Sequence, residues 1–73
     1  MFSREEFGER LRRERNRAGE SQKTLADLLG VGTTQISELE NGNTTTSFER
    51  LVLLCEHYQV SADYLLGLKD ERQ

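Results

Sequence analysis

The chain has 73 residues, a length that fits one small domain with a hydrophobic core of modest stability. Apolar residues make up 34% and charged residues 32%, with a net charge of −3, which excludes a uniformly basic nucleic-acid-binding protein. The sequence has no run of 18 apolar residues, and its N-terminus is charged from Arg4 onward. We therefore expect neither a membrane span nor a signal peptide.

The charge is unevenly distributed along the chain. Residues 1–23 carry seven Lys or Arg and five Asp or Glu, whereas residues 24–73 carry three and eight. A basic N-terminal helix therefore remains compatible with nucleic-acid binding, and the alternative is a solvent-exposed face with internal ion pairs. The single cysteine, Cys55, cannot form an internal disulfide, so a reducing cytoplasm is the expected location.

The first predicted helix begins after Ser3, and Glu6 follows three residues later, as in a capping box. Its apolar residues recur at helical spacing and share one face: Phe7, Leu11 and Ala18. Gly19 is expected to end the helix. Arg15 lies four residues after Leu11 and is therefore predicted on the same inward face, which is an unusual position for a charge.

The second predicted helix is capped by Ser21 and spans residues 22–29. Its inward side is formed by Leu25, Ala26, Leu28 and Leu29. Gly30 is expected to end it in the left-handed conformation, which glycine adopts at little cost. Only about three residues separate this end from the start of the next helix, and two short helices joined in this way form a helix-turn-helix.

The third predicted helix begins after Gly32 or Thr33, and Ile36 and Leu39 place its apolar side inward. Glu40 lies four residues after Ile36 and is also predicted to point partly inward. The outward face carries hydroxyl, amide and carboxylate groups and no large apolar side chain. Its members are Thr33, Thr34, Ser37, Glu38 and Asn41.

Such a polar face can enter the major groove of DNA without burying an apolar patch. A threonine can place its methyl group on a thymine methyl or its hydroxyl on a base edge, and a glutamate can accept a hydrogen bond from cytosine N4. The alternative is an ordinary amphipathic helix with a solvated polar side. The preceding helix and the length of the turn favour the DNA-reading interpretation.

A polar loop of residues 41–47 precedes the fourth predicted helix, which is capped by Ser47 or Thr46. The broad apolar face of this helix comprises Phe48, Leu51, Val52, Leu54, Cys55 and Tyr58. In this setting Cys55 is interpreted as a buried structural thiol rather than a nucleophile.

The fifth predicted helix is short, is capped by Ser61 and ends at Gly67. It contains Ala62, Leu65 and Leu66. Beyond Leu68, the polar tail of residues 69–73 is expected to be frayed. The sequence thus predicts an all-α fold, a compact five-helix bundle that contains a helix-turn-helix and forms one domain over residues 1–68.

The stretch SQKTLADLLGVGTTQISELENG resembles the helix-turn-helix of the Cro and lambda-repressor type, often called the XRE family. The resemblance extends from about Phe7 to Gly67 and includes the RxxxG pattern at Arg15 and Gly19. The later FERLVLLCEHYQVSADYLLG resembles the fourth and fifth helices of that family. The resemblance implies a lambda-repressor-like fold and a sequence-specific DNA-binding transcriptional regulator, expected to be a repressor, whose third helix enters the major groove of a double-stranded operator.

The resemblance also implies roles for individual residues. The positions that meet bases are Thr33, Thr34, Ser37 and Glu38. The positions that contact the DNA backbone are Gln22, Asn41, Asn43 and Thr45. Arg15 and Glu40 match family positions that form an ion pair between the first and third helices, which would satisfy two charges that are costly to bury singly. The alternative is two independent, partly exposed side chains.

The sequence departs from the family at several positions. The loop of residues 43–46 carries no Lys or Arg, although the family often has one directly after the ENG motif, and Glu14 and Glu20 stand where apolar residues are frequent. These changes remove phosphate neutralisation and add local repulsion, so they favour weak, salt-sensitive or partner-assisted DNA binding. We also expect a homodimer, because the C-terminal segment has more apolar residues than one face of a short helix can hold: Tyr64, Leu65, Leu66 and Leu68.

One alternative function is a protein-interaction module or antitoxin-like partner that retains the fold without tight DNA binding. An enzyme is disfavoured, because the only histidine, His57, is interpreted as a last-turn residue that favours the helix dipole. No metal-ligand cluster or phosphate-binding glycine loop is visible. We expect no cofactor, no metal, no membrane association and no small-molecule effector.

Overall fold

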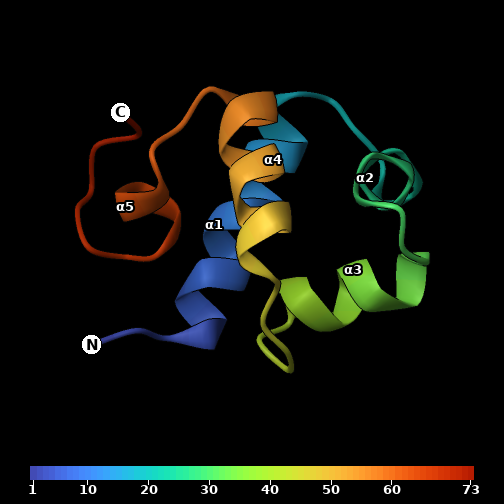
Figure 1. Ribbon diagram of the computed structural model, residues 1–73, viewed down its shortest axis with the longest axis horizontal. Coiled ribbons are helices and arrows are strands. Elements are labelled where there is room, and N and C mark those ends of the chain that lie inside the picture. The colour runs from blue at the N-terminus through green and yellow to red at the C-terminus, as the bar shows by residue number, and fades with distance from the viewer.

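The computed structural model describes all 73 residues and contains five α-helices and no strand (Figure 1). In chain order these are α1 (Arg4–Arg17), α2 (Gln22–Leu29), α3 (Thr33–Glu40), α4 (Phe48–Tyr58) and α5 (Ala62–Leu65). The predicted all-α fold with five helices is confirmed. None of these helices combines the length and the apolar composition that a membrane crossing requires.

Four of the five helices begin at a serine whose hydroxyl oxygen accepts a hydrogen bond from the backbone N–H three residues later. These serines are Ser3, Ser21, Ser47 and Ser61. The exception is α3, which begins after Gly32 and has no side-chain cap. The turn before it depends on Gly30, whose φ of 70° is the left-handed conformation predicted for the end of α2.

The core is one cluster of twelve buried apolar residues to which all five helices contribute. Its members are Phe7, Leu11, Leu25, Ala26, Leu29, Ile36, Leu39, Leu54, Tyr58, Val60, Tyr64 and Leu65. Three other residues expected on inward faces are exposed: Ala18, Leu28 and Val52. Phe48, also expected in the core, is 85% exposed. Phe48 and Val52 lie one turn apart on the flank of α4, beside the face that carries Leu54 and Tyr58, so the core does not reach them.

The backbones of α1 and α3 approach each other closely at Gly8. A Cβ atom at this position would lie 2.4 Å from the carbonyl oxygen of Leu39 and 2.5 Å from that of Glu40. Glycine is unfavourable within a helix, but here it is required because both neighbouring atoms belong to the backbone of α3. This approach brings the side chains of α1 within reach of the inner side of α3.

A buried ion pair then ties α1 to α3. The Glu40 side chain is fully buried, and its Oε2 accepts a hydrogen bond from Arg15 Nε at 2.7 Å. Its Oε1 accepts from Arg15 Nη2 at 3.2 Å and from Gln22 Nε2 at 3.1 Å. Arg12 Nε lies 3.6 Å from the same oxygen. The predicted Arg15–Glu40 pair is therefore formed, and the Glu40 carboxylate joins α1, α2 and α3.

The C-terminal tail does not fray, contrary to the expectation from its composition; Figure 1 shows it looping back beyond α5. Arg72 donates from Nε to Glu14 Oε2 at 3.0 Å and from Nη2 to Glu14 Oε1 at 2.6 Å. Arg10 donates from Nη1 to the carbonyl oxygen of Lys69 at 2.8 Å. Both Arg10 and Glu14 are buried on α1 and need polar partners, which the tail supplies.

We expect Glu40→Gln to lower the free energy of unfolding by about 3–5 kcal/mol, because it removes the charge that Arg15 faces across a buried contact. Urea denaturation of both chains would measure this, with Glu9→Gln as the control, since Glu9 pairs with Arg13 on the surface. A loss of this size would lower the melting temperature of a domain of this length by well over about 4 °C. A Glu40→Gln variant that melts like the parent would contradict a stabilising pair.

The tail contact predicts acid-sensitive stability. Burial alone would raise the pKa of the Glu14 carboxyl, but hydrogen bonding and charge from Arg72, with smaller contributions from Arg17 and Tyr64, lower it below its ordinary value of 4.5. A lowered folded-state pKa contributes stability that is fully present above the unfolded pKa and is lost as the pH falls through the folded one.

We therefore expect the stability difference between the parent and Glu14→Gln to be constant near neutral pH and to shrink as the pH falls below about 4.5. Thermal melts of both chains across this pH range would measure the difference. Glu9→Gln is again the control, because that carboxylate is exposed. If the stability difference between the parent and Glu14→Gln grew as the pH fell, the result would contradict an ion pair between Glu14 and Arg72.

Candidate nucleic-acid interface

The outward face of α3 presents polar side chains to solvent. Thr33 and Thr34 are exposed at its N-terminal end, and Ser37 and Glu38 are half-buried one turn later. Ser37 Oγ accepts a hydrogen bond from Asn41 Nδ2 at 3.5 Å, at the end of the helix. The structure therefore brings the four predicted base-reading residues together on one surface, where their polar groups are accessible to a ligand.

The predicted backbone-contact residues border this surface. Asn41 lies at the C-terminal end of α3, and Asn43 and Thr45 are exposed in the loop that follows. Gln22 is the first residue of α2, and its side-chain amide donates to Glu40. Gln22 thus braces α3 directly, while the first backbone N–H groups of α2 have no partner within their own helix.

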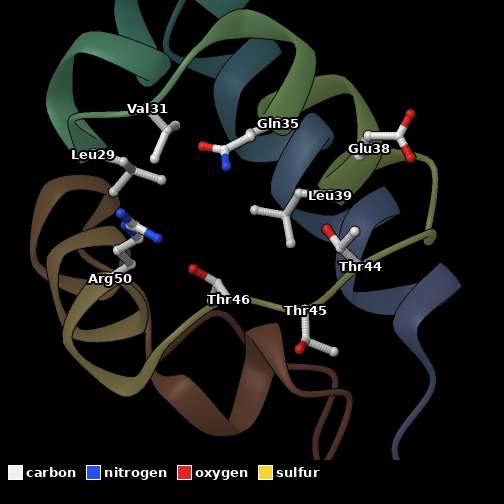
Figure 2. Close-up of a pocket in the computed structure, with 9 residues that line it drawn as sticks. All are labelled: Leu29, Val31, Gln35, Glu38, Leu39, Thr44, Thr45, Thr46 and Arg50. Atoms are coloured by element: carbon white, nitrogen blue, oxygen red, sulfur yellow. The ribbon is translucent and has the colours of Figure 1, made fainter.

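A groove runs beside α3, between this helix, the loop that follows it and the first turn of α4 (Figure 2). Gln35 points into the groove, whereas the carboxylate of Glu38 points away from it. Arg50 of α4 extends toward Leu29 at the far side. Sequence reasoning did not include Gln35 or Arg50 in the site, because their positions depend on how α4 packs beside α3.

Two arginines of α1 reach the end of α3 and the loop. Arg12 Nη2 donates to Asn41 Oδ1 at 2.8 Å, and Arg4 Nη1 donates to the carbonyl oxygen of Asn43 at 3.5 Å. Sequence reasoning assigned neither residue a role. The only available signal was the positive charge of the N-terminal third, which indicated a basic helix but not where its side chains would end.

Two acidic residues expected to repel DNA are engaged within the fold instead. Glu14 is buried beneath Arg72, and Glu20 Oε1 accepts a hydrogen bond from the Tyr58 hydroxyl at 2.8 Å. Burial and this hydrogen bond raise the pKa of Tyr58, so its hydroxyl stays protonated and donates. Both carboxylates thus have partners inside the molecule, which reduces the local repulsion that the sequence predicts for them.

His57 is not simply a free residue at a helix end. It lies in the last turn of α4, as predicted, and its Nε2 is 2.6 Å from Glu20 Oε2.

Cys55 is only half-buried, and burial raises the pKa of its thiol, which makes it a weaker nucleophile. No group of three or more His, Cys, Asp or Glu side chains is placed to hold a metal ion.

Two of the four residues predicted at a dimer interface lie in the core instead. Tyr64 is 3% exposed and Leu65 is fully buried. The Arg10 guanidinium carbon lies 4.7 Å from the centroid of the Tyr64 ring, so a side chain of α1 covers this ring within the same subunit. The prediction is therefore wrong for Tyr64 and Leu65, whereas Leu66 is half-buried and Leu68 is exposed.

The chain matches the family model described as a helix-turn-helix domain over residues 6–66. It is 41% identical over 65 residues to the HTH-type transcriptional regulator ImmR of Bacillus subtilis (strain 168), and the match covers 89% of this chain and 50% of ImmR. It is 37% identical over 71 residues to PrpR of Mycobacterium tuberculosis (strain ATCC 25618 / H37Rv), covering 97% of this chain and 15% of PrpR. The chain thus spans half of ImmR and a much smaller part of PrpR.

Solved structures share the fold. The P22 c2 repressor, solved in complex with the synthetic operator 9T, has a TM-score of 0.78 and 35% identity, with 86% of this chain and 96% of that chain covered. The restriction-modification controller protein C.AhdI from Aeromonas hydrophila has a TM-score of 0.74 and 31% identity, with coverage of 85% and 94%. With its five-helix architecture and a family match over residues 6–66, the chain belongs to the helix-turn-helix family of the Cro and lambda-repressor type.

Proposed function

We propose that this chain is a sequence-specific DNA-binding transcriptional regulator, acting as a repressor, that places α3 in the major groove of a double-stranded operator. The observation that supports this most directly is the outward face of α3, which is polar, accessible and free of large apolar side chains on the second helix of a helix-turn-helix. The likeness to a repressor solved with operator DNA adds independent support.

In this proposal the base-reading residues are Thr33, Thr34, Ser37 and Glu38. The residues that position the DNA backbone are Gln22, Asn41, Asn43 and Thr45. The start of α3 has no side-chain cap, so its first backbone N–H groups, beside the two threonines, can also donate to an acceptor on the DNA. Gln22 would contact the DNA backbone through the main-chain N–H groups at the start of α2. Its side-chain amide donates to Glu40 and so holds α3 in place.

The acidic net charge is compatible with this proposal because several carboxylates are neutralised within the fold. Glu14 and Glu40 are buried against arginines, and Glu20 bonds to Tyr58 and His57. Glu38 remains as the acidic group on the reading face. We expect weak DNA binding with a shallow salt dependence, because the binding constant falls by only about 0.9 log unit per log unit of salt for each phosphate that a cation neutralises, and few cations lie near this face.

The sharpest prediction concerns Glu38, which opposes phosphate but can accept a hydrogen bond from cytosine. Glu38→Gln should strengthen binding to unrelated DNA and relax the preference at one base pair. Operators would first be selected from a random DNA library, and binding to a panel substituted at each position would then be measured at fixed salt. Glu56→Gln, an equal change of charge at an exposed position on α4, is the matched control.

The other side chains should separate into two classes in the same assay. Thr33→Ala, Thr34→Ala and Ser37→Ala should each cost about 1–3 kcal/mol on the preferred operator and little on unrelated DNA. Asn43→Ala should weaken binding to all sequences alike. If every α3 variant kept the parental preference profile, α3 would not be the reader, and the protein-interaction module would be the better description of this domain.

We also propose that the chain forms a homodimer through an apolar groove lined by Phe2, Phe7, Phe48, Leu51 and Leu66. Phe48 lines this groove and is 85% exposed, and an apolar groove with an exposed aromatic ring is the kind of surface that marks an interaction site. A second copy would cover these rings. A two-fold dimer would also present two α3 helices to half-sites about 34 Å apart.

Phe48→Ser should therefore raise the dissociation constant of the dimer by about tenfold or more, because a large ring buried in an interface typically contributes more than 1 kcal/mol. Analytical ultracentrifugation across a concentration series would measure this. Leu28→Ser, at an exposed apolar position on α2 outside the groove, is the control. A parent chain that remains monomeric at high concentration, both alone and on operator DNA, would rule the dimer out.

A further inference from the structure

Arg12 of α1 contacts three polar groups at the C-terminal end of α3. Its Nη2 donates to Asn41 Oδ1 at 2.8 Å and to the carbonyl oxygen of Glu40 at 3.4 Å. Its Nε lies 3.6 Å from the carboxylate of Glu40. The Arg12 side chain is nevertheless 43% exposed, and both of its hydrogen bonds within the protein use Nη2, so Nη1 can donate to a ligand.

The contact with Arg12 fixes which end of the Asn41 amide faces outward. An asparagine amide has one oxygen that accepts and one nitrogen that donates two hydrogen bonds, whereas a guanidinium group can only donate. The oxygen must therefore face Arg12. The nitrogen donates to Ser37 Oγ at 3.5 Å, which leaves its second hydrogen available.

This orientation suits one kind of ligand. The non-bridging oxygens of a DNA phosphate are acceptors, so a contacting side chain must donate to them. With its oxygen engaged by Arg12, Asn41 offers only a donor to the outside. The guanidinium group of Arg12 lies beside Asn41 and offers a further donor together with a positive charge. Hydrogen bonds from a charged donor are stronger than those between neutral groups.

We infer that Arg12 is a positioning residue that orients Asn41 as a donor, and that the two side chains together bind one phosphate of the DNA backbone. This inference rests on the proposed function and deepens it. It also accounts for the uncharged loop after Gly42, because the cation that this loop lacks is supplied by α1.

Arg13 provides a matched control one residue away. It carries the same charge, its side chain is 54% exposed, and its partner is Glu9 at 3.2 Å rather than any residue of α3. Arg12→Gln and Arg13→Gln therefore change the net charge of the protein equally. Any difference between them reports the local role of Arg12 and not the overall charge.

The experiment measures binding to a duplex of unrelated sequence at a series of salt concentrations. The chains compared are the parent, Arg12→Gln, Arg12→Lys, Arg13→Gln, Asn41→Ala and the double variant with Arg12→Gln and Asn41→Ala. We expect Arg12→Gln to weaken binding about tenfold or more. It should also reduce the salt slope by about 0.9, the value for one phosphate, whereas Arg13→Gln should leave both close to the parent.

Coupling between Arg12 and Asn41 tests the positioning role. Asn41→Ala should weaken binding without changing the salt slope, because asparagine is neutral. Arg12→Gln should then cost less in the Asn41→Ala background than in the parent. Arg12→Lys should keep the slope but restore only part of the affinity, because an ammonium group lacks the planar fork of guanidinium.

The outcomes separate this inference from the proposed function. If the parent binds no duplex at low salt, the proposed function fails and the inference fails with it. If the parent binds and Arg12→Gln behaves like Arg13→Gln, DNA binding stands and the inference is overturned. Additive effects of Arg12→Gln and Asn41→Ala would overturn the positioning role. Circular dichroism of each variant ensures that folded chains are compared, and Arg12→Lys serves in the cycle if Arg12→Gln does not fold.

Discussion

The buried carboxylate of Glu40 is the interaction on which the rest of the structure depends. Arg15 reaches it from α1 and Gln22 from α2, while its own backbone forms the last turn of α3. Three helices are thus joined at a single charged group, at the inner side of the helix whose outer side is proposed to read DNA. Because a buried charge is tolerated only in a narrow geometry, this contact fixes the orientation of α3 more strictly than apolar packing alone would.

Buried charged contacts also occur on another side of α1. Arg10 is buried against Tyr64 and the tail, and Glu14 is buried against Arg72. A core of twelve apolar residues is small, so charged groups on α1 extend the interior beyond the apolar cluster. The chain is acidic overall, yet much of its charge stabilises contacts between helices, which reconciles its composition with a nucleic-acid-binding fold.

Features set by local chemistry were predictable from the sequence. Serine caps, the left-handed Gly30 and the outward face of α3 depend on neighbouring residues and helical periodicity, and the structure has all of them. What could not be predicted depends on distant contacts. Tyr64 is buried because Arg10 covers it, and the tail is held because Arg72 reaches Glu14. The roles of the base-reading residues stay predictions, because they depend on the operator, a second molecule whose base sequence this chain does not encode.

The close approach at Gly8 has a consequence for how variation in this chain would be tolerated. The two helix backbones meet with no room for a methyl group, so any larger residue at position 8 must push α1 away from α3. Arg12 and Arg15 would both recede from Glu40, and Asn41 would lose the partner that orients it. Gly8 is buried and lies away from the outward face of α3, yet it sets the distance between the two helices that support this face. A change at position 8 would therefore alter both the stability of the domain and the geometry of the proposed DNA-binding surface.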